Sequence, residues 1–374
     1  MTPEQIYSER FCLRRPAPSG DLRQALARQL QEPVPRLHEE IRPWQEVYRW
    51  DHTSYAKRQE AGWPNPLPSP AQFWNPLIEF CRTTDRPFLA RLLLDGPNFA
   101  PTSEGDVHQV YSFWGHCVLP NLLSKHGDLL KSVILNHSLY RSFLNTNLNV
   151  GPNSARGRKL PPDENLAREL MEVLSYGPAF QDTGDMTELA LLLTGLRSDG
   201  YDPTYAEPGT RTILGRTFAQ GDIAGFLDWI AVHPATARHQ VDRMVRPILG
   251  RNLTPALHDH LAERWIATGG DRRAVLQAMV MHDDAWSPLR GAPVNTLVGY
   301  VSYLHEHGIV LKPGKTPFVV WQTHLGYRYE AAPNPKGLAI DDRLIGGGFL
   351  LHRAQWPGTL PQRLSAMSHT RTIV

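Results

Sequence analysis

The sequence predicts a mainly α protein: a multi-helix globular domain with few or short strands and long proline-rich loops. Three observations carry this prediction. Apolar residues recur at spacings of three and four along many segments, and several of these segments begin at a capping residue and end at a glycine. Alternating strand patterns are few. The chain of 374 residues contains 32 prolines, which indicates many rigid connections between the helices.

The composition is that of an ordinary soluble protein, with 41% hydrophobic and 20% charged residues. The formal net charge of +2 argues against nucleic acid or an anionic membrane as a partner, and no apolar run is long enough to span a bilayer. Cys12, Cys81 and Cys117 are odd in number and far apart, so they form neither a disulfide framework nor a metal knuckle. Because the first residues lack a secretory pattern, we expect a cytoplasmic protein.

The chain divides into three parts by its patterns. Residues 1–75 form an N-terminal wrapping segment, 76–356 a helical core and 357–374 a C-terminal tail. The N-terminal segment holds an amphipathic helix over 21–30, followed by a stretch rich in proline and tryptophan from Trp44 to Trp74. This stretch either anchors the segment on the core through its tryptophans or forms a lid over a binding surface.

The core reads mainly as helices joined by loops. Helical patterns cover 88–94, 107–123 and 127–135, and a polar loop over 151–162 leads into a helix that ends at Gly177. A helix with a capping box starts at Asp185, and 198–212 is suited to a hairpin. Pro234 begins a helix that ends near Gly250. The remaining expected elements are helices over 255–268, 272–282 and 294–307, a loop over 313–335 and a helix over 344–356.

The helix that ends at Gly177 carries the most informative polar residues. Asp163 is expected to cap it, and its apolar stripe consists of Ala167, Leu170, Met171 and Leu174. Glu164, Arg168 and Glu172 are four residues apart and share a face. Asn165 and Glu169 form a second such pair. This pattern is typical either of surface ion pairs or of the carboxylate-rich wall of a pocket, and periodicity alone favours the ion pairs.

Several segments together resemble a known family. The segments 164–172 and 187–195 are similar to the signature of the bacterial domain-of-unknown-function 1800 family, and further pieces follow in order at 213–218, 233–238 and 269–276. Phe113-Trp114 resembles the start of the family block Phe-Trp-His-Asn-His-Phe. The resemblance covers roughly residues 105–350 and implies a fold better than an activity, since the family's activity is not established.

The chain departs from the family at its histidines. The two histidines of the family block fall on Gly115 and Cys117, and that of the family's Glu-Leu-His-Thr-Leu-Gly falls on Leu174. Ala206-Glu207 stands where the family often has His-Asp. If those histidines bind a transition metal, the resemblance implies that much of the site is lost here. His116 and Cys117 are the candidate replacement ligands, although His116 is one position out of register.

The polar residues that match the family are the candidate site. We expect catalytic roles for Glu164, Arg168, Glu169, Glu172 and His233, and substrate-binding roles for Asn165, Arg216 and Arg238. His233 precedes a proline at a helix start, where a neutral imidazole serves either as an acceptor or as a structural cap. The arginines either hold a carboxylate substrate or pair with carboxylates inside the fold.

Two functions follow from this set. One is an enzyme whose helical pocket performs acid–base or metal-assisted chemistry on a small molecule or a modified peptide, as in biosynthetic tailoring. The alternative is a non-catalytic scaffold or partner subunit with a decayed metal site. Convergence of the polar residues on an open cavity favours the enzyme, and a sealed ion-pair network favours the scaffold.

Overall fold

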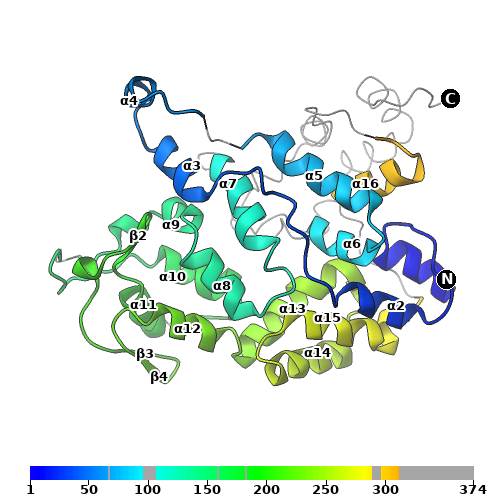
Figure 1. Cartoon of the computed structure of the whole chain (residues 1–374). Helices are drawn as coiled ribbons and strands as arrows, with labels where there is room; N and C mark the ends of the chain where they lie inside the picture. The colour runs from blue at the N-terminus through cyan, green and yellow to red at the C-terminus, as the bar shows by residue number, and fades with distance from the viewer. Residues whose placement is uncertain (66–67, 96–106, 158–159, 182, 289–295, 311–374) are drawn as a thin grey trace, which may run out of the picture.

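Helices make up nearly all of the regular structure, as predicted. The computed structural model describes residues 1–65, 68–95, 107–157, 160–181, 183–288 and 296–310. Within these residues there are sixteen α-helices and two antiparallel sheets of two short strands each (Figure 1). The fold class predicted by the helical spacing of apolar residues is therefore confirmed.

The N-terminal residues wrap around the molecule. After α1 (Pro3–Ile6) and α2 (Leu22–Gln29), an irregular segment over 31–43 crosses from the end that holds α15 to α3 (Trp44–Asp51) and α4 (Tyr55–Glu60) at the other end (Figure 1). Helix α2 is the helix predicted over 21–30, and the carboxylate of Asp21 accepts from the N–H groups of Arg23 and Gln24. Trp74, on α5 (Pro70–Thr83), is fully buried and anchors the following chain.

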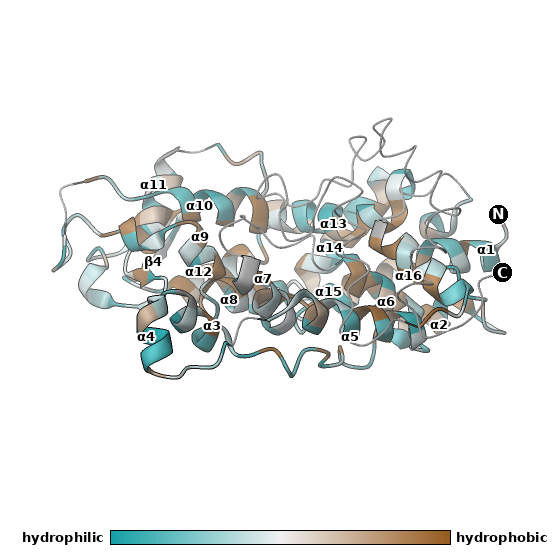
Figure 2. Ribbon diagram, turned by 90° about the horizontal axis from the view of Figure 1, so that it is seen from above, coloured by the Kyte–Doolittle hydropathy of each residue, from teal (hydrophilic) through white to brown (hydrophobic). Residues whose placement is uncertain are grey.

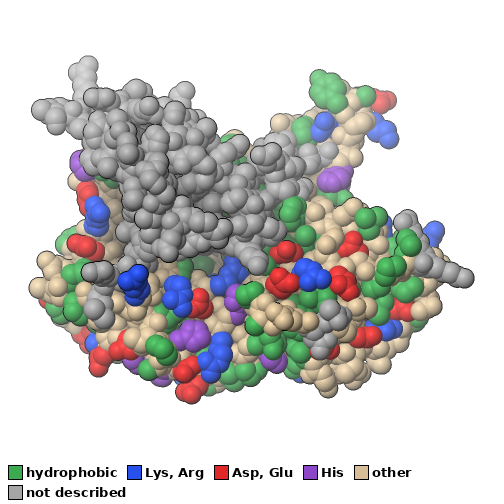
Figure 3. Space-filling view, turned by 180° about the vertical axis from the view of Figure 1, so that it is seen from behind, with side chains coloured by type: hydrophobic (Ala, Val, Ile, Leu, Met, Phe, Trp, Pro, Cys, Tyr) green, Lys and Arg blue, Asp and Glu red, His purple; other side chains and the backbone are tan. Residues whose placement is uncertain are grey.

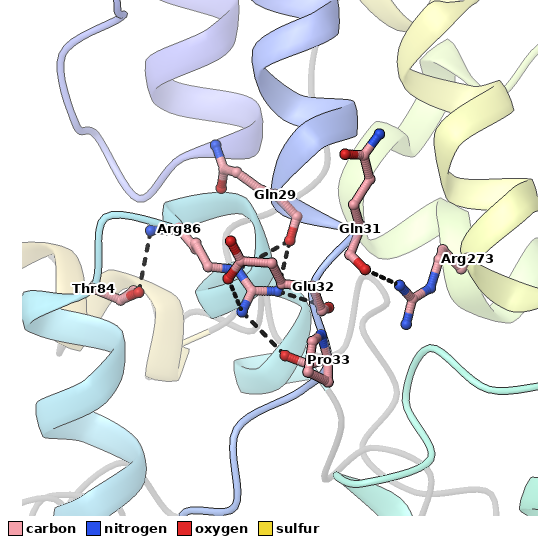
Figure 4. Close-up of polar contacts among 7 residues, drawn as sticks. All are labelled: Gln29, Gln31, Glu32, Pro33, Thr84, Arg86 and Arg273. Carbon is pink, nitrogen blue, oxygen red and sulfur yellow. Dashed lines mark hydrogen bonds and ion pairs between the residues drawn. The ribbon is translucent and has the colours of Figure 1, made fainter.

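Arg86 fastens the end of α2 to the core (Figure 4). Its guanidinium donates to the carbonyl oxygens of Gln29, Glu32 and Pro33 at distances of 2.7 to 3.1 Å. On the other side, Arg273 donates to the carbonyl oxygen of Gln31. One of these carbonyl groups, that of Gln29, is among those that a helix leaves without partners at its C-terminus, and the others lie just beyond it. Two arginines of the core therefore hold the chain at residues 29–33, ahead of the tryptophan-rich stretch for which anchoring was predicted.

The central helices bring the family's histidine positions into the core. They are α6 (Pro87–Asp95), α7 (Val107–Phe113), α8 (His126–Ile134) and α9 (Leu139–Phe143), and a π-helical turn, Trp114–Val118, continues α7. Phe113, Trp114 and Cys117 are buried. A Cβ atom on Gly115 would lie only 3.0 Å from the Cβ of His38, so the N-terminal segment fills the space above this turn. Any side chain larger than that of glycine at position 115, such as the family's histidine, would have to displace His38.

The structure has two hairpins, one at each end of the segment 198–212 in which a single hairpin was expected. Helix α11 (Thr183–Leu192) leads into β1 (Leu196–Arg197) and β2 (Gly200–Tyr201), and β3 (Arg211–Ile213) then pairs with β4 (Arg216–Phe218). The predicted start of α11 at Asp185 is wrong, because the helix begins two residues earlier. The Asp185 carboxylate instead accepts from the N–H of Leu214, at 2.9 Å, so it holds the second hairpin.

There are five further described helices, and three of them begin at the predicted positions. The five are α12 (Ile223–Ile230), α13 (Pro234–Leu249), α14 (Pro255–Ala267), α15 (Arg272–Met281) and α16 (Thr296–Glu306). His233, Thr254 and Asp271 accept from first-turn N–H groups of α13, α14 and α15. The loop expected over 313–335 and the helix over 344–356 lie outside the described residues.

Apolar side chains from nearly all of these helices form one continuous core. Helices α13, α14 and α15 pack in succession, while α8 packs on α12 and α15 packs on α2. Figure 2 shows apolar residues on the helix faces turned toward the middle of the molecule, whereas α4, which buries no side chain, is hydrophilic. The polar signature residues therefore lie on, or just under, the surface of a helical core.

Candidate functional site

The predicted signature helix is an α-helix that widens into a π-helix. Helix α10 (Asn165–Glu169) continues directly into the π-helical turn Leu170–Leu174. The Asp163 carboxylate accepts from the N–H of Asn165 at 2.9 Å, as expected of a residue at the helix start. The N-cap position itself is occupied by Glu164, so the helix begins one residue later than predicted. Gly177 has the expected left-handed conformation, with φ of +105°, and donates to the carbonyl oxygen of Met171. The predicted apolar stripe is buried. π-Helical turns often occur at functional positions.

Glu164, Arg168 and Glu172 form an ion-pair ladder along the outer face of this helix. The Arg168 guanidinium lies 3.4 Å from Glu164 and 3.3 Å from Glu172. The Arg168 side chain is 52% exposed, so solvent screens both pairs strongly. Thr187 of α11 donates to the second carboxylate oxygen of Glu164, at 2.8 Å. The ladder therefore matches the surface ion-pair interpretation. Asn165 beside it is exposed.

Glu169 belongs to a different environment from the ladder. Burial raises the pKa of the Tyr140 hydroxyl well above its ordinary value, and the nearby Glu169 carboxylate raises it further. Burial lowers the pKa of Arg243, whereas Tyr140 and Glu169 oppose that shift. Glu169 thus interacts with groups of α9 and α13 in the interior. The structure brings Glu164, Arg168 and Glu172 together and separates Glu169 from them.

Side chains from other helices bind the carbonyl groups at the end of the π-helical turn. Arg243 and Gln240, both on α13, donate to the carbonyl oxygen of Val173. His126, at the start of α8, lies 2.8 Å from the carbonyl oxygen of Leu174, to which its Nε2 donates. Burial lowers the pKa of His126 to about 3, so this ring is neutral at pH 7. These three residues form a carbonyl-binding cluster that fixes the end of the helix.

The sequence patterns did not predict this cluster. Gln240 and Arg243 are one turn apart on α13, and Gln240 is buried beside Ala237 and Val241. The one available signal was a polar residue within an apolar helix face. His126 gave no signal, because nothing in its local sequence distinguishes it from an exposed histidine.

His233 caps a helix and lies in a row of rings. Its Nδ1 accepts from the N–H of Ala235 at 3.2 Å, so the proton of the neutral ring is on Nε2. The imidazole stacks on Tyr176, with ring centres 5.2 Å apart, and meets Trp229 edge-on at 5.8 Å. Burial lowers the pKa of His233 and so favours the neutral ring. Both expected features, a neutral ring and a helix cap, are therefore present. The cap occupies Nδ1, which is the acceptor nitrogen of the neutral ring.

The two remaining arginines lie in different places. The Arg216 guanidinium, on β4, lies over the ring of Trp229, 5.7 Å from its centre, and so extends the row from Tyr176 and His233. We call Tyr176, His233, Trp229 and Arg216 the aromatic row. All three rings are partly exposed and Arg216 is exposed. Arg238 instead pairs with Asp259 of α14 and takes no part in the row.

The candidate metal ligands are engaged elsewhere. His116 donates through Nε2 to the carbonyl oxygen of Ile41, at 2.9 Å. Burial raises the pKa of the Cys117 thiol to about 11, which disfavours the thiolate that a metal requires. Across the described residues, no three or more His, Cys, Asp or Glu side chains are grouped so as to hold a metal ion. His116, Cys117, Glu169 and His233 therefore do not fit a shared metal.

The fold and this site define a mainly α protein. Its signature helix carries ion pairs on its outer face, and polar side chains of neighbouring helices bind the carbonyl groups at its inner end. The chain belongs to the family described as "Protein of unknown function (DUF1800)", whose model matches residues 19–372. No curated protein and no solved structure matches the chain. Among the helices that the structure describes, none has the length and apolar character to span a membrane.

Proposed function

We propose that this chain is a non-catalytic member of its family that acts as a scaffold or partner subunit. One observation carries the proposal: most of the charged side chains expected to line a pocket already pair with another side chain or bind the backbone. Arg168 pairs within its own helix, Arg238 pairs with Asp259, and Nδ1 of His233 caps α13. A catalytic site would instead direct such groups at a shared space.

The aromatic row is the surface that we assign to the partner protein. Trp, Tyr and Arg carry much of the binding energy at protein interfaces, because they bury large areas and still donate hydrogen bonds. Trp229, Tyr176 and Arg216 supply these three residue types side by side. Acidic and basic side chains are interspersed over the face in Figure 3, which suits a protein better than nucleic acid.

A binding measurement with matched variants tests this function. The tagged chain is purified from its host, the co-purifying protein is produced separately, and the affinity is measured by calorimetry. We expect Arg216→Ala and Trp229→Ala to weaken binding about tenfold or more. Arg168→Met should leave it unchanged. Equal affinity for all three variants, or no complex with the purified protein, would contradict the proposal.

An enzyme is the second candidate function. The observation that favours it is the fixed orientation of the His233 ring. The cap holds its ring in one neutral tautomer with the proton on Nε2, so that this N–H is a positioned hydrogen-bond donor for a polarised substrate atom. Such an enzyme would perform acid–base or metal-assisted chemistry on a small molecule or a modified peptide. Elemental analysis of tag-free protein is the test. Stoichiometric binding of a transition metal by the wild type, lost in His116→Gln, would support metal-assisted chemistry. If the protein takes up no iron, zinc or copper, metal-assisted chemistry is excluded.

A cytoplasmic location completes the proposal. It rests on the balanced composition, with a net charge of +2. Fractionation of host cells tests it directly: recovery of the chain outside the cytoplasm would contradict this part of the proposal and leave the partner surface unaffected.

A further inference from the structure

A buried arginine in the half of the molecule near α3 forms no ion pair with any carboxylate of the described residues. Arg141, on α9, is 2% exposed, and none of the described ion pairs includes it. Its Nη1 donates to the carbonyl oxygen of Leu135 at 3.1 Å, whereas its buried Nε has no acceptor among the described residues. Burial lowers the pKa of Arg141 to about 10, so the side chain stays charged at pH 7. The Asp199 carboxylate is near enough to favour the charged guanidinium, but it forms no ion pair with Arg141 among the described contacts. A buried charge without a counter-charge in direct contact is unfavourable.

Two further donors near Arg141 are also buried without an acceptor. Nδ1 of His137 accepts from the N–H of Leu139 at 3.0 Å, so the proton of the neutral ring is on Nε2. The Gln109 side chain accepts through Oε1 from Ser138, at 2.6 Å, so its amide nitrogen is the remaining polar group. Both residues are fully buried, and neither nitrogen has an acceptor within the part of the chain that the structure describes.

The three donors belong to one region. The Trp44 ring lies 5.7 Å from the His137 ring and 5.5 Å from the Arg141 guanidinium carbon. Gln109 is tied to the same region, because its partner Ser138 adjoins His137. Helix α3, which carries Trp44, packs against α7, which carries Gln109, and α7 packs against α9 (Figure 1). Tyr48 of α3 is held by a 2.7 Å hydrogen bond to Ser198.

We propose that the region enclosed by α3, α7 and α9 binds a small oxyanion, a carboxylate or a phosphate group, through Arg141, His137 and Gln109. The chemistry of the donors carries the assignment. All three free positions are N–H groups, so their natural partner offers only acceptor oxygens. An oxyanion would also place a negative charge in direct contact with the guanidinium, which the more distant Asp199 does not. Trp44 would cover it and keep water out. The site is separate from the aromatic row, so it goes beyond the proposed function.

Thermal unfolding of the full chain in different anions tests the site. Sodium phosphate, sodium succinate and sodium chloride are titrated at constant ionic strength. We expect phosphate or succinate to raise Tm saturably, by about 2 °C or more relative to chloride, because a ligand that binds only the folded state stabilises it. A response to phosphate alone identifies a phosphate site, and a response to succinate alone a carboxylate site.

Gln109→Glu is the decisive variant, since it places an internal carboxylate of the same shape beside the donors. We expect this variant to lose the anion response and to unfold at a higher Tm than the wild type in chloride. Arg246→Gln, which removes an exposed arginine paired with Asp242, is the matched control and should keep the response. No saturable response in the wild type, or an equal response in Gln109→Glu, would overturn the proposal and assign the three donors to water.

Discussion

The Nε2 nitrogen of His126 lies 2.8 Å from the carbonyl oxygen of Leu174 and donates to it. Leu174 occupies the position at which the family resemblance leads us to expect a histidine, and it is fully buried. An imidazole is therefore present at the end of this helix, but it comes from α8 and binds the backbone. Its role is to satisfy a buried carbonyl group, which otherwise costs free energy.

Buried neutral histidines should make the protein sensitive to mild acid. Burial lowers the pKa of His126 to about 3 and that of His38 to about 4, from ordinary values of 6.5. Below pH 6.5 the unfolded chain binds more protons than the folded chain. The stabilisation is therefore complete above pH 6.5 and declines as the pH falls toward these lowered values. Each histidine should account for a loss of about 2 kcal/mol between pH 7 and pH 5.

His126→Gln keeps a donor for the Leu174 carbonyl group and removes the titration. Urea unfolding at pH 7 and pH 5 should therefore show a smaller acid loss in this variant by about 2 kcal/mol. His52→Gln, at an exposed position after α3, is the control and should keep the wild-type loss. Equal acid losses in His126→Gln and the wild type would show that His126 is already charged in the folded state.

Gly177 should tolerate no side chain. It has φ of +105°, and an added Cβ would lie 2.8 Å from Cγ of His239. Gly20 has a similar φ of +95° with nothing within 4 Å, so Gly20→Ala measures the backbone strain alone. We expect Gly177→Ala to lower the free energy of unfolding by about 1–3 kcal/mol more than Gly20→Ala. Adding His239→Ala should recover part of the difference, and additive losses would argue against the contact.

The two sides of the signature helix should differ in their contribution to stability. Arg168→Met breaks exposed ion pairs and should cost less than about 1 kcal/mol, with a smaller cost at high salt. Arg243→Met removes a donor from the carbonyl oxygen of Val173 and should cost about 2–3 kcal/mol. Urea unfolding at low and high salt measures both. The reverse order would place the important contacts on the outer face.

Arg86 should control the attachment of the N-terminal segment. Arg86→Ala removes the donors for three carbonyl groups at and just beyond the end of α2, those of Gln29, Glu32 and Pro33. We expect faster hydrogen exchange over residues 30–43, measured by mass spectrometry, because opening of this segment then needs less free energy. Arg36→Ala, at an exposed position of the same segment, should leave exchange unchanged. Equal exchange in both variants would mean that apolar packing alone holds the segment.

Local signals in the sequence determined most helix boundaries. Asp21, Thr254 and Asp271 cap the helices that follow them, because a side-chain oxygen next to a helix start binds its first N–H groups wherever the helix lies. The apolar stripe of the signature helix and the Arg168 ladder also follow from spacing alone. Asp185 was the exception, since a distant hairpin competes for its carboxylate.

Only the tertiary structure decided which polar residues act together. The pairing of Arg243 with a carbonyl group 70 residues earlier, and the approach of Trp44 to Arg141, join segments far apart in the chain. Helical periodicity assigns a residue to a face but does not determine what packs against that face. The sequence by itself therefore determined a helical protein of this family with a charged signature face. The interior cluster, the aromatic row and the buried donors depend on how the helices pack.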